Sequence, residues 1–315
     1  MKQFLSVHDA VDVAALVAEA RQHKAGPFAV EELGRRRTIG LVFFNSSLRT
    51  RLSTQRAAQN LGMQVIVLNT GQDAWQLEFA DGTVMDGGSA EHIREAAAVL
   101  GEYCDIIGVR AFASLKDRDA DEKEEVIGSM VRFSGRPVVS LESAMRHPLQ
   151  SLADCITIEE FRTVPRPKVV LTWAPHPRAL PQAVPNSFVE WMRERDVDLV
   201  VTHPEGYELS QEFIQDTRIE YDQSAAFAGA HFIYAKNWSC YAQYGQRLHE
   251  GNDWMVTAEK MSATENAKFM HCLPVRRNVI VEDAVLDSAS SIVIQQAGNR
   301  IWSAQAVLAR MLEAL

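Results

Sequence analysis

The sequence predicts an α/β protein with two doubly wound domains, each built on a mainly parallel sheet. Short apolar runs typical of buried strands alternate with amphipathic, helix-like segments along most of the chain. The 315 residues are enough for two domains of roughly 150 residues each. Polar motifs follow directly after several predicted strands, which is where open parallel sheets bind their ligands.

The strands are predicted from short runs rich in Val, Ile and other apolar residues. They span residues 38–44, 63–69, 104–112, 137–143, 168–174, 197–204, 230–236, 267–274 and 290–297. Helices are expected at residues 52–62, 90–103, 186–196 and 302–315, where the apolar spacing is helical. Residues 172–188 carry the prolines Pro175, Pro177, Pro181 and Pro185, and they predict a stiff loop that is neither sheet nor helix.

The domain boundary is predicted to follow the segment RHPLQSLADCITIEEF, whose first half starts the connection between the two sheets. We expect a first domain of residues 1–148 and a second domain of residues 149–299. Residues 300–315 are strongly amphipathic, and they are expected to pack back on the first domain as a helix.

The composition excludes several classes of protein. A net charge of −9 without a basic tract disfavours nucleic acid or an anionic membrane as the main partner. The four cysteines are scattered without CxxC spacing, which fits neither a disulfide scaffold nor a zinc site. There is no secretory signal or membrane-length apolar run, and no P-loop or GxGxxG motif. We therefore expect a cytoplasmic protein with neither a metal nor a cofactor.

The segment FFNSSLRTR joins a predicted strand to a predicted helix. Ser46, Ser47 and Thr50 can cap the helix, and the free N–H groups at its start favour an anion. Arg49 and Arg51 carry guanidinium groups that match phosphate oxygens. The alternative is a capped helix with two solvated arginines, but cations in a first helical turn oppose the helix dipole. A bound anion would compensate them, so the segment predicts a phosphate site.

The segment RHPLQ places His147 and Gln150 one helical turn apart, across Pro148. Proline suits the first position of a helix. His147 could donate a hydrogen bond to a carbonyl oxygen, and the Gln150 amide could accept one from an amino group. A helix start with a polar cap explains the same residues equally well.

The motif HCLPVRRN ends a predicted strand. Cys272 beside His271 suggests a nucleophile, but neighbouring strand residues point to opposite faces, so His271 cannot readily activate it. A buried cysteine near a ligand is favoured over thiolate catalysis. Arg276 or Arg277 is well placed to bind a carboxylate. His176 is the polar group of the proline-rich segment, which either lines a site or serves as a rigid connector.

The motifs SLRTR, HPLQ and HCLP, in this order, resemble those of the aspartate/ornithine transcarbamylase family. The resemblance spans nearly the whole chain. It implies transfer of a carbamoyl group from carbamoyl phosphate to an amine. It also implies a knotted second domain and a homotrimer with sites shared between subunits.

The resemblance assigns a set of residues to carbamoyl phosphate, with residues 1–148 as the domain that binds it. These residues are Ser47, Leu48, Arg49, Thr50, Trp75, Arg110, His147, Gln150, Cys272, Leu273 and Arg300. Trp75 matches a tryptophan that is lent to the neighbouring subunit. The catalytic subset is Arg49, His147, Gln150, Cys272 and Arg300.

The acceptor side resembles the N-acylornithine branch of the family. The DGNN loop and SMG motif of ornithine carbamoyltransferases are missing, and TWAPHPRALPQAVPNSF and YAKNWSCYAQYG stand in their place. Residues 149–299 are accordingly the expected acylornithine-binding domain. The resemblance assigns the acylornithine to Glu142, His176, Lys236, Arg276 and Ala90.

The residue at position 90, Ala90, helps to distinguish an acetyl from a succinyl group on the acceptor. The acetyl branch tends to carry glutamate at this position and the succinyl branch proline. A small neutral residue leaves room for a longer acyl chain and does not repel its terminal carboxylate. The acetyl branch also carries a lysine in the last helix, where this chain has Gln305. These features favour N-succinylornithine as the acceptor, with N-acetylornithine as the alternative.

Two other interpretations remain open. One is a transcarbamylase with a different amine as its acceptor. The other is a non-catalytic anion-binding or regulatory protein with the same fold.

Overall fold

The computed structural model describes residues 1–248 and 251–315. The chain divides into two compact units. Unit 1 comprises Met1–Leu149 and Arg300–Leu315, and unit 2 comprises Gln150–Asn299. Two helices contain residues of both units: α6 (Pro148–Phe161) and α12 (Val293–Leu312).

Unit 1 is built on a parallel five-stranded sheet with the order β1-β7-β6-β2-β3. The strands are β1 (Gln3–Phe4), β2 (Thr38–Phe43), β3 (Gln64–Asn69), β6 (Ile106–Arg110) and β7 (Val138–Glu142). All residues of β6 and β7 are buried, which explains their continuous apolar runs. The short strands β4 (Leu77–Glu78) and β5 (Glu91–His92) form a separate pair.

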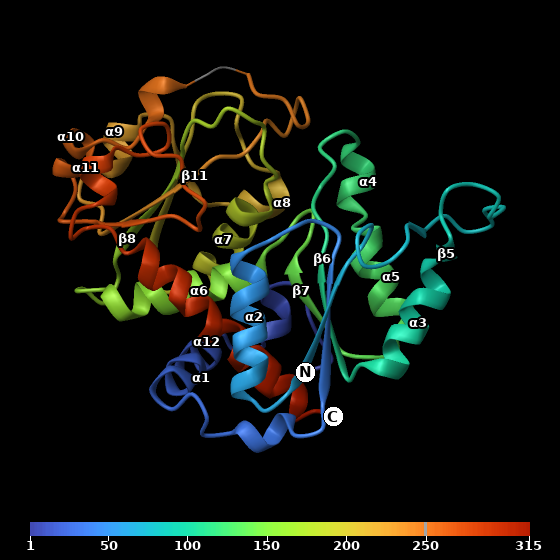
Figure 1. Cartoon of the computed structure of the whole chain (residues 1–315). Coiled ribbons are helices and arrows are strands. Elements are labelled where there is room, and N and C mark those ends of the chain that lie inside the picture. The colour runs from blue at the N-terminus through green and yellow to red at the C-terminus, as the bar shows by residue number, and fades with distance from the viewer. Residues whose placement is uncertain (249–250) are drawn as a thin grey trace. The chain divides into compact units, whose positions relative to one another are not determined.

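Helices cover the sheet of unit 1 on both faces (Figure 1). On one face α3 (Ile93–Tyr103) and α5 (Glu125–Phe133) bury Ile93, Ala97 and Met130 against strand residues such as Val42 and Val109. The other helices of the unit are α1 (Val13–Ala25), α2 (Arg49–Asn60) and the short α4 (Arg118–Glu122), with 3-10 turns at Val7–Ala10 and Glu31–Gly34.

Unit 2 repeats this architecture, with a parallel sheet in the order β10-β9-β8-β11-β12. The strands are β8 (Lys168–Trp173), β9 (Asp198–Thr202), β10 (Arg218–Glu220), β11 (Phe232–Lys236) and β12 (Lys268–Met270). Its core includes Val170, Val200, Ile233 and Phe269 from neighbouring strands. The α/β class and both parallel sheets are therefore as predicted.

The remaining helices of unit 2 follow its strands in the chain. They are α7 (Ala183–Arg193), α8 (Gln211–Ile214), α9 (Gln223–Phe227), α10 (Ala258–Ser262) and α11 (Asp283–Leu286), with a 3-10 turn at Asn252–Trp254. Across residues 1–248 and 251–315, no helix is both long and apolar enough to cross a membrane.

The strand predicted at residues 290–297 is wrong, because α12 begins at Val293. Buried residues recur at helical spacing from this point, at Ile292, Val293, Gln296, Asn299 and Arg300. A short apolar run does not distinguish a buried strand from a buried helix start. Here the buried side chains of Gln296, Asn299 and Arg300 form hydrogen bonds with residues distant in the chain. These bonds favour the helix over the strand.

The loop predicted at residues 172–188 is wrong at both ends. Thr172 and Trp173 complete β8, and residues from Ala183 onward belong to α7. Pro185 lies in the first turn of α7, where its missing N–H costs no helical hydrogen bond. Only residues 174–182 form the irregular segment that the prolines predicted.

Candidate active site

The phosphate motif of unit 1 lies between β2 and α2. Helix α2 begins at Arg49, and the Ser47 hydroxyl accepts the Thr50 N–H at 3.3 Å. Within α2, which is described in full, the first turn holds no acidic residue. Arg49 and Arg51 therefore add positive charge at the positive end of the helix dipole, inside an acidic protein. This arrangement favours a bound anion.

Arg110 holds the loop that precedes α2. Its Nη1 donates to the carbonyl oxygens of Asn45 (2.8 Å) and Ser46 (2.7 Å), and its Nη2 donates to Glu142 Oε2 at 3.0 Å. Burial lowers the pKa of Arg110, while the charge of Glu142 and its hydrogen bond act in the opposite direction. The guanidinium also lies 4.0 Å from the centre of the Phe112 ring. Arg110 thus fixes the shape of the loop.

Arg300 lies between the Thr50 hydroxyl and the His147 ring in the buried part of unit 1. Arg300 Nη2 donates to Thr50 Oγ1 at 2.5 Å and lies 3.4 Å from His147 Nε2. His147 Nε2 also lies 3.7 Å from Glu142 Oε2. These side chains come from segments far apart in the chain, yet they form one cluster.

The cluster of unit 1 sits at the carboxyl ends of three adjacent strands. Phe43 ends β2, Arg110 ends β6 and Glu142 ends β7, and these strands are neighbours in the sheet. Parallel sheets commonly bind ligands at this edge. The structure therefore brings Ser47, Leu48, Arg49, Thr50, Arg110, Glu142, His147 and Arg300 to one edge of unit 1.

Trp75 follows β3 and is 57 % exposed. Its indole Nε1 donates to Glu91 Oε2 at 2.8 Å. The ring borders an apolar hollow of about 320 Å³, whose lining also includes Ile66, Val99 and Tyr103. Among the described residues, no hydrogen bond joins Trp75 to the cluster of its own chain.

The motif HCLP of unit 2 follows β12 as a tightly held loop. The Gln296 side-chain oxygen accepts the His271 N–H at 2.9 Å, and His271 Nδ1 accepts the Leu273 N–H at 2.8 Å. His271 is buried and bonded to its own loop, while Cys272 is partly exposed. Leu273 has a φ of 57°, a conformation that is uncommon for a bulky residue and concentrates at functional sites.

A hollow of about 440 Å³ in unit 2 has a basic and apolar lining. It is lined by Pro175, His176, Pro177, Arg247, Val275, Arg276, Arg277 and Val279. Arg276 Nε donates to His176 Nε2 at 3.0 Å, and Arg247 Nη1 donates to the His176 carbonyl at 3.3 Å. Burial lowers the pKa of His176, as do the charges of Arg276, Lys236 and Arg178, while a hydrogen bond with the Arg178 backbone raises it.

Arg277, the neighbour of Arg276, forms ion pairs with two carboxylates. Its guanidinium bonds to Asp283 at 2.7 Å and to Asp287 at 2.6 Å. These hydrogen bonds raise the pKa of Arg277. Of the two arginines that the sequence left open, Arg276 is therefore the one beside His176, while Arg277 ties its loop to α11.

The other acceptor-side residues lie on different elements. Lys236 ends β11, and its backbone oxygen accepts the Ala174 N–H at 3.1 Å. Ala90 is exposed in the loop before β5, in unit 1. Gln305 is fully buried in unit 1, where it accepts from Asn60 and donates to the Pro27 carbonyl. The difference between Gln305 and the lysine of the acetyl branch therefore gives no support to a choice of acyl group.

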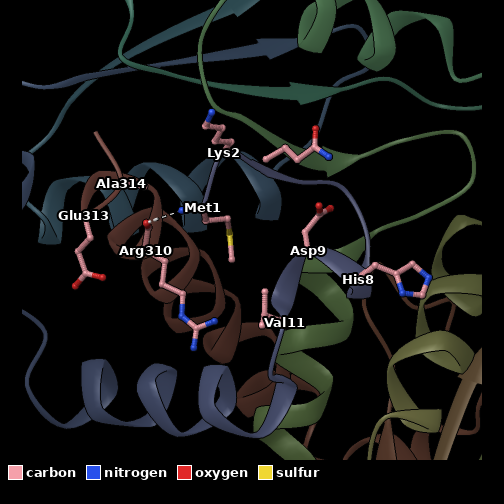
Figure 2. A pocket seen from close by; sticks show the side chains of 9 residues that line it. Met1, Lys2, His8, Asp9, Val11, Arg310, Glu313 and Ala314 are labelled. Carbon is pink, nitrogen blue, oxygen red and sulfur yellow. Dashed lines mark hydrogen bonds between the residues drawn. The ribbon is translucent and has the colours of Figure 1, made fainter.

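A third hollow lies beside the chain termini in unit 1 and contains none of the predicted site residues (Figure 2). Two of its charged groups, Arg310 and Asp9, are bonded within the fold. Arg310 pairs with Glu19 at 2.7 Å, and the Asp9 carboxylate accepts the N–H groups of Leu5 and Ser6. Within the described residues, no group of three or more His, Cys, Asp or Glu side chains could hold a metal ion.

The sequence prediction missed three residues that shape the site. Asn45 holds the phosphate loop through its side chain, which accepts the Phe112 N–H at 2.7 Å. Arg247 lines the basic hollow, and Asp154 binds the Gln150 amide at 2.8 Å. Of these three residues, only Asp154 could have been found from the sequence, since a helix brings residues 150 and 154 together.

Comparisons with known proteins agree with this geometry. Residues 2–160 match the carbamoyl-P binding domain of aspartate/ornithine carbamoyltransferases, and residues 181–311 match their Asp/Orn binding domain. The chain belongs to the aspartate/ornithine carbamoyltransferase family.

Two groups of relatives cover essentially the whole chain. N-succinylornithine carbamoyltransferase of Bacteroides thetaiotaomicron is 56% identical over 317 residues, which are 100% of both chains. N-acetylornithine carbamoyltransferase of Xanthomonas campestris pv. campestris is 36% identical over 335 residues, covering 99% of this chain and 98% of the relative.

A solved structure shares the fold over nearly every residue. It is a variant of N-acetyl-L-ornithine transcarbamylase in complex with carbamyl phosphate and N-succinyl-L-norvaline. The TM-score is 0.93 and the sequence identity is 37%. The match covers 99% of this chain and 100% of the chain in that structure.

Proposed function

We propose that this protein transfers the carbamoyl group of carbamoyl phosphate to the δ-amine of N-succinyl-L-ornithine. The products are N-succinyl-L-citrulline and phosphate, and the reaction is a step of arginine biosynthesis. The observation that carries the proposal is the cluster of Thr50, His147 and Arg300 at the start of α2, in a family of carbamoyl phosphate enzymes. The acyl group follows from the relatives that are 56% and 57% identical over the full chain.

The phosphate end of the donor substrate binds at the start of α2. The hydroxyls of Ser47 and Thr50, the backbone N–H groups of the first turn and the Arg49 guanidinium surround it. Arg110 supports this loop through its hydrogen bonds to the carbonyl oxygens of Asn45 and Ser46. It also adds positive charge to the phosphate site. The backbone at Leu48 supplies a further donor.

The carbamoyl end is held and polarised by Arg49, His147, Gln150 and Arg300. Negative charge develops on the carbamoyl oxygen as the amine attacks. Donors that are already in place stabilise it without reorganising. The Gln150 amide oxygen accepts from the carbamoyl NH2 group.

The chemical step needs no covalent enzyme intermediate. The δ-nitrogen forms a bond to the carbamoyl carbon, the bond from that carbon to the phosphate oxygen breaks, and the departing phosphate takes the amine proton. The amine must be neutral, although its free pKa resembles that of lysine at about 10.4. Positive neighbours and desolvation lower it. Cys272 and the Leu273 carbonyl border the amine, and Glu142 orients the acylornithine.

The carboxylates of the acceptor bind to His176, Lys236 and Arg276. The basic hollow around His176 is suited to a carboxylate, because its guanidinium groups offer charge-assisted hydrogen bonds. The lowered pKa of His176 leaves it neutral near pH 7, which avoids one more cation beside Arg276.

Ala90 leaves space for the succinyl group. The position is expected to carry glutamate in the acetyl branch, and a carboxylate there would repel the succinate end. A variant of N-acetyl-L-ornithine transcarbamylase in which a glutamate is replaced by alanine has been solved with N-succinyl-L-norvaline. That relative supports the idea that a small neutral residue accepts the longer acyl chain.

The working unit is proposed to be a homotrimer in which Trp75 and Ala90 complete the site of a neighbouring copy. Trp75, Tyr103 and Ile66 are exposed around the apolar hollow at the edge strand β3, a surface typical of association sites. The loop that leads to β5 extends away from the sheet of unit 1 (Figure 1). Sedimentation is expected to give three times the chain mass of 35.2 kDa. A monomer that is fully active would contradict shared sites.

The acceptor is tested by assaying N-succinyl-, N-acetyl- and free ornithine side by side with carbamoyl phosphate. We expect the highest kcat/KM with N-succinylornithine, because the basic hollow and Ala90 suit its extra carboxylate. Faster turnover of N-acetylornithine would overturn the choice of acyl group. Phosphate binding in calorimetry without product from any ornithine derivative would instead favour a non-catalytic anion-binding protein.

A further inference from the structure

Asp154 is a fully buried carboxylate of unit 2 that the proposed mechanism does not use. It lies on α6 one turn after Gln150 and has 0% exposure. Its Oδ1 accepts two amide N–H groups, from Gln150 Nε2 at 2.8 Å and from Gln296 Nε2 at 2.7 Å. Burying a carboxylate is costly unless it is hydrogen-bonded, so this position demands an explanation.

The carboxylate determines which end of the Gln150 amide faces it. Asp154 Oδ1 accepts the hydrogen bond from Gln150 Nε2, so the Gln150 amide presents its NH2 end to Asp154. The carbonyl end then points elsewhere. Gln150 Oε1 is buried and has no hydrogen-bond partner among the described residues. A buried oxygen without a hydrogen-bond partner can accept a hydrogen bond from a ligand.

The same oxygen of Asp154 orients a second amide. With its NH2 end on Asp154, Gln296 turns its carbonyl end to the His271 N–H, which it accepts at 2.9 Å. His271 in turn accepts the Leu273 N–H, so the chain of bonds reaches the loop that carries Cys272. A reversed Gln296 would place two donors against each other at His271.

The Tyr234 hydroxyl lies beside the same group. Burial raises the pKa of Tyr234 well above its usual range, and the neighbouring Asp154 and Cys272 add to the effect. Tyr234 therefore keeps its proton and remains a donor. The two bonds to Asp154 Oδ1 fix the directions of both amides, and this buried oxygen is a rigid reference point for them.

We propose that Asp154 is a positioning residue that aims the Gln150 carbonyl at the carbamoyl NH2 group and fixes the loop at Cys272 through Gln296. The proposal rests on the function given above and deepens it. Asp154 touches no substrate and acts by fixing the direction of two amides. Discrimination between an NH2 group and a methyl group on the donor substrate then depends on Asp154.

A purely structural tie between α6 and α12 is the competing explanation. The two helices share such a tie one turn further along. There Asn299 Nδ2 donates to Thr157 Oγ1 at 3.0 Å and to Glu160 Oε2 at 2.9 Å. This buried pair does not involve Gln150 or Gln296, so it provides a matched control.

The test compares Asp154→Asn with Thr157→Val in the full-length enzyme. Asparagine has the same shape but offers an NH2 group, so it permits Gln150 to reverse. The measured quantities are the binding of carbamoyl phosphate, of acetyl phosphate and of inorganic phosphate, together with kcat and both KM values. Acetyl phosphate carries a methyl group where carbamoyl phosphate has NH2.

In the wild type we expect carbamoyl phosphate to bind more tightly than acetyl phosphate. In Asp154→Asn this preference is expected to fall about 10-fold or more, as for loss of a buried hydrogen bond, while inorganic phosphate binds as before. Thr157→Val should lower the melting temperature but keep the preference. If Asp154→Asn does not fold, Asp154→Ser gives the same comparison with a smaller side chain.

Two results would overturn the proposal while leaving the function intact. One is an active Asp154→Asn enzyme whose preference for carbamoyl over acetyl phosphate stays within twofold of the wild type. The other is equal weakening of all three ligands, which would reduce Asp154 to a structural tie. A wild type that transfers no carbamoyl group would instead overturn the proposed function itself.

Discussion

Replacing Arg49 with alanine is expected to lower kcat/KM by at least about 10²- to 10³-fold, the loss seen when one donor to a developing charge is removed. Arg49 stands at the first position of α2, at the positive end of the helix dipole. In the proposed site the variant loses contacts to both the phosphate and the carbamoyl oxygen. Steady-state kinetics and calorimetric binding of inorganic phosphate measure the two losses separately.

Arg56→Ala is the matched control for this experiment. Arg56 lies on the same helix but is exposed, so its removal should change activity and stability very little. The two variants should melt at similar temperatures. Near-normal turnover of a folded Arg49→Ala protein would remove the phosphate site from the start of α2.

Replacing Arg276 with alanine is expected to raise the KM for N-succinylornithine by about 10- to 100-fold, the range for losing one charged hydrogen bond. Arg276 lies beside His176 in the basic hollow, where we place a carboxylate of the acceptor. The KM for carbamoyl phosphate should stay near its wild-type value, because we place its phosphate in unit 1. Kinetics with each substrate varied in turn check both statements.

The neighbouring arginine supplies the control. Arg277→Ala removes the bonds to Asp283 and Asp287 but no proposed contact with substrate. Exposed ion pairs contribute little stability, so this variant should remain folded and active. A larger rise in the acceptor KM for Arg277→Ala than for Arg276→Ala would show that the wrong arginine has been assigned.

The sequence predicted local features well where neighbours in the chain decide them. The apolar run of β2, the small polar residues after it and the start of α2 are one continuous segment. The prediction of a helix near residues 52–62 is confirmed, although α2 begins three residues earlier at Arg49. Likewise Pro148 begins α6, because a proline at a first helical position loses no hydrogen bond.

The predictions failed where distant residues decide the outcome. Residues 290–297 have the composition of a strand, but Gln296 is bonded to Asp154, 142 residues away in the chain. Such a buried polar contact fixes the helical register and is invisible to a local pattern. Helix α7 begins at Ala183, before the predicted start at residue 186, because the first turn of a helix tolerates Pro185.

By itself the sequence determined the α/β class and the two parallel sheets, since strand, turn and helix propensities act within a few residues. It also predicted a phosphate site at the start of α2. Only the tertiary structure separated Arg276 from Arg277 and revealed Asp154 behind Gln150. The contact between Arg276 and His176 joins residues 100 positions apart. The direction of a long side chain depends on the partners that the fold brings to it, and neighbouring residues in the sequence do not specify those partners.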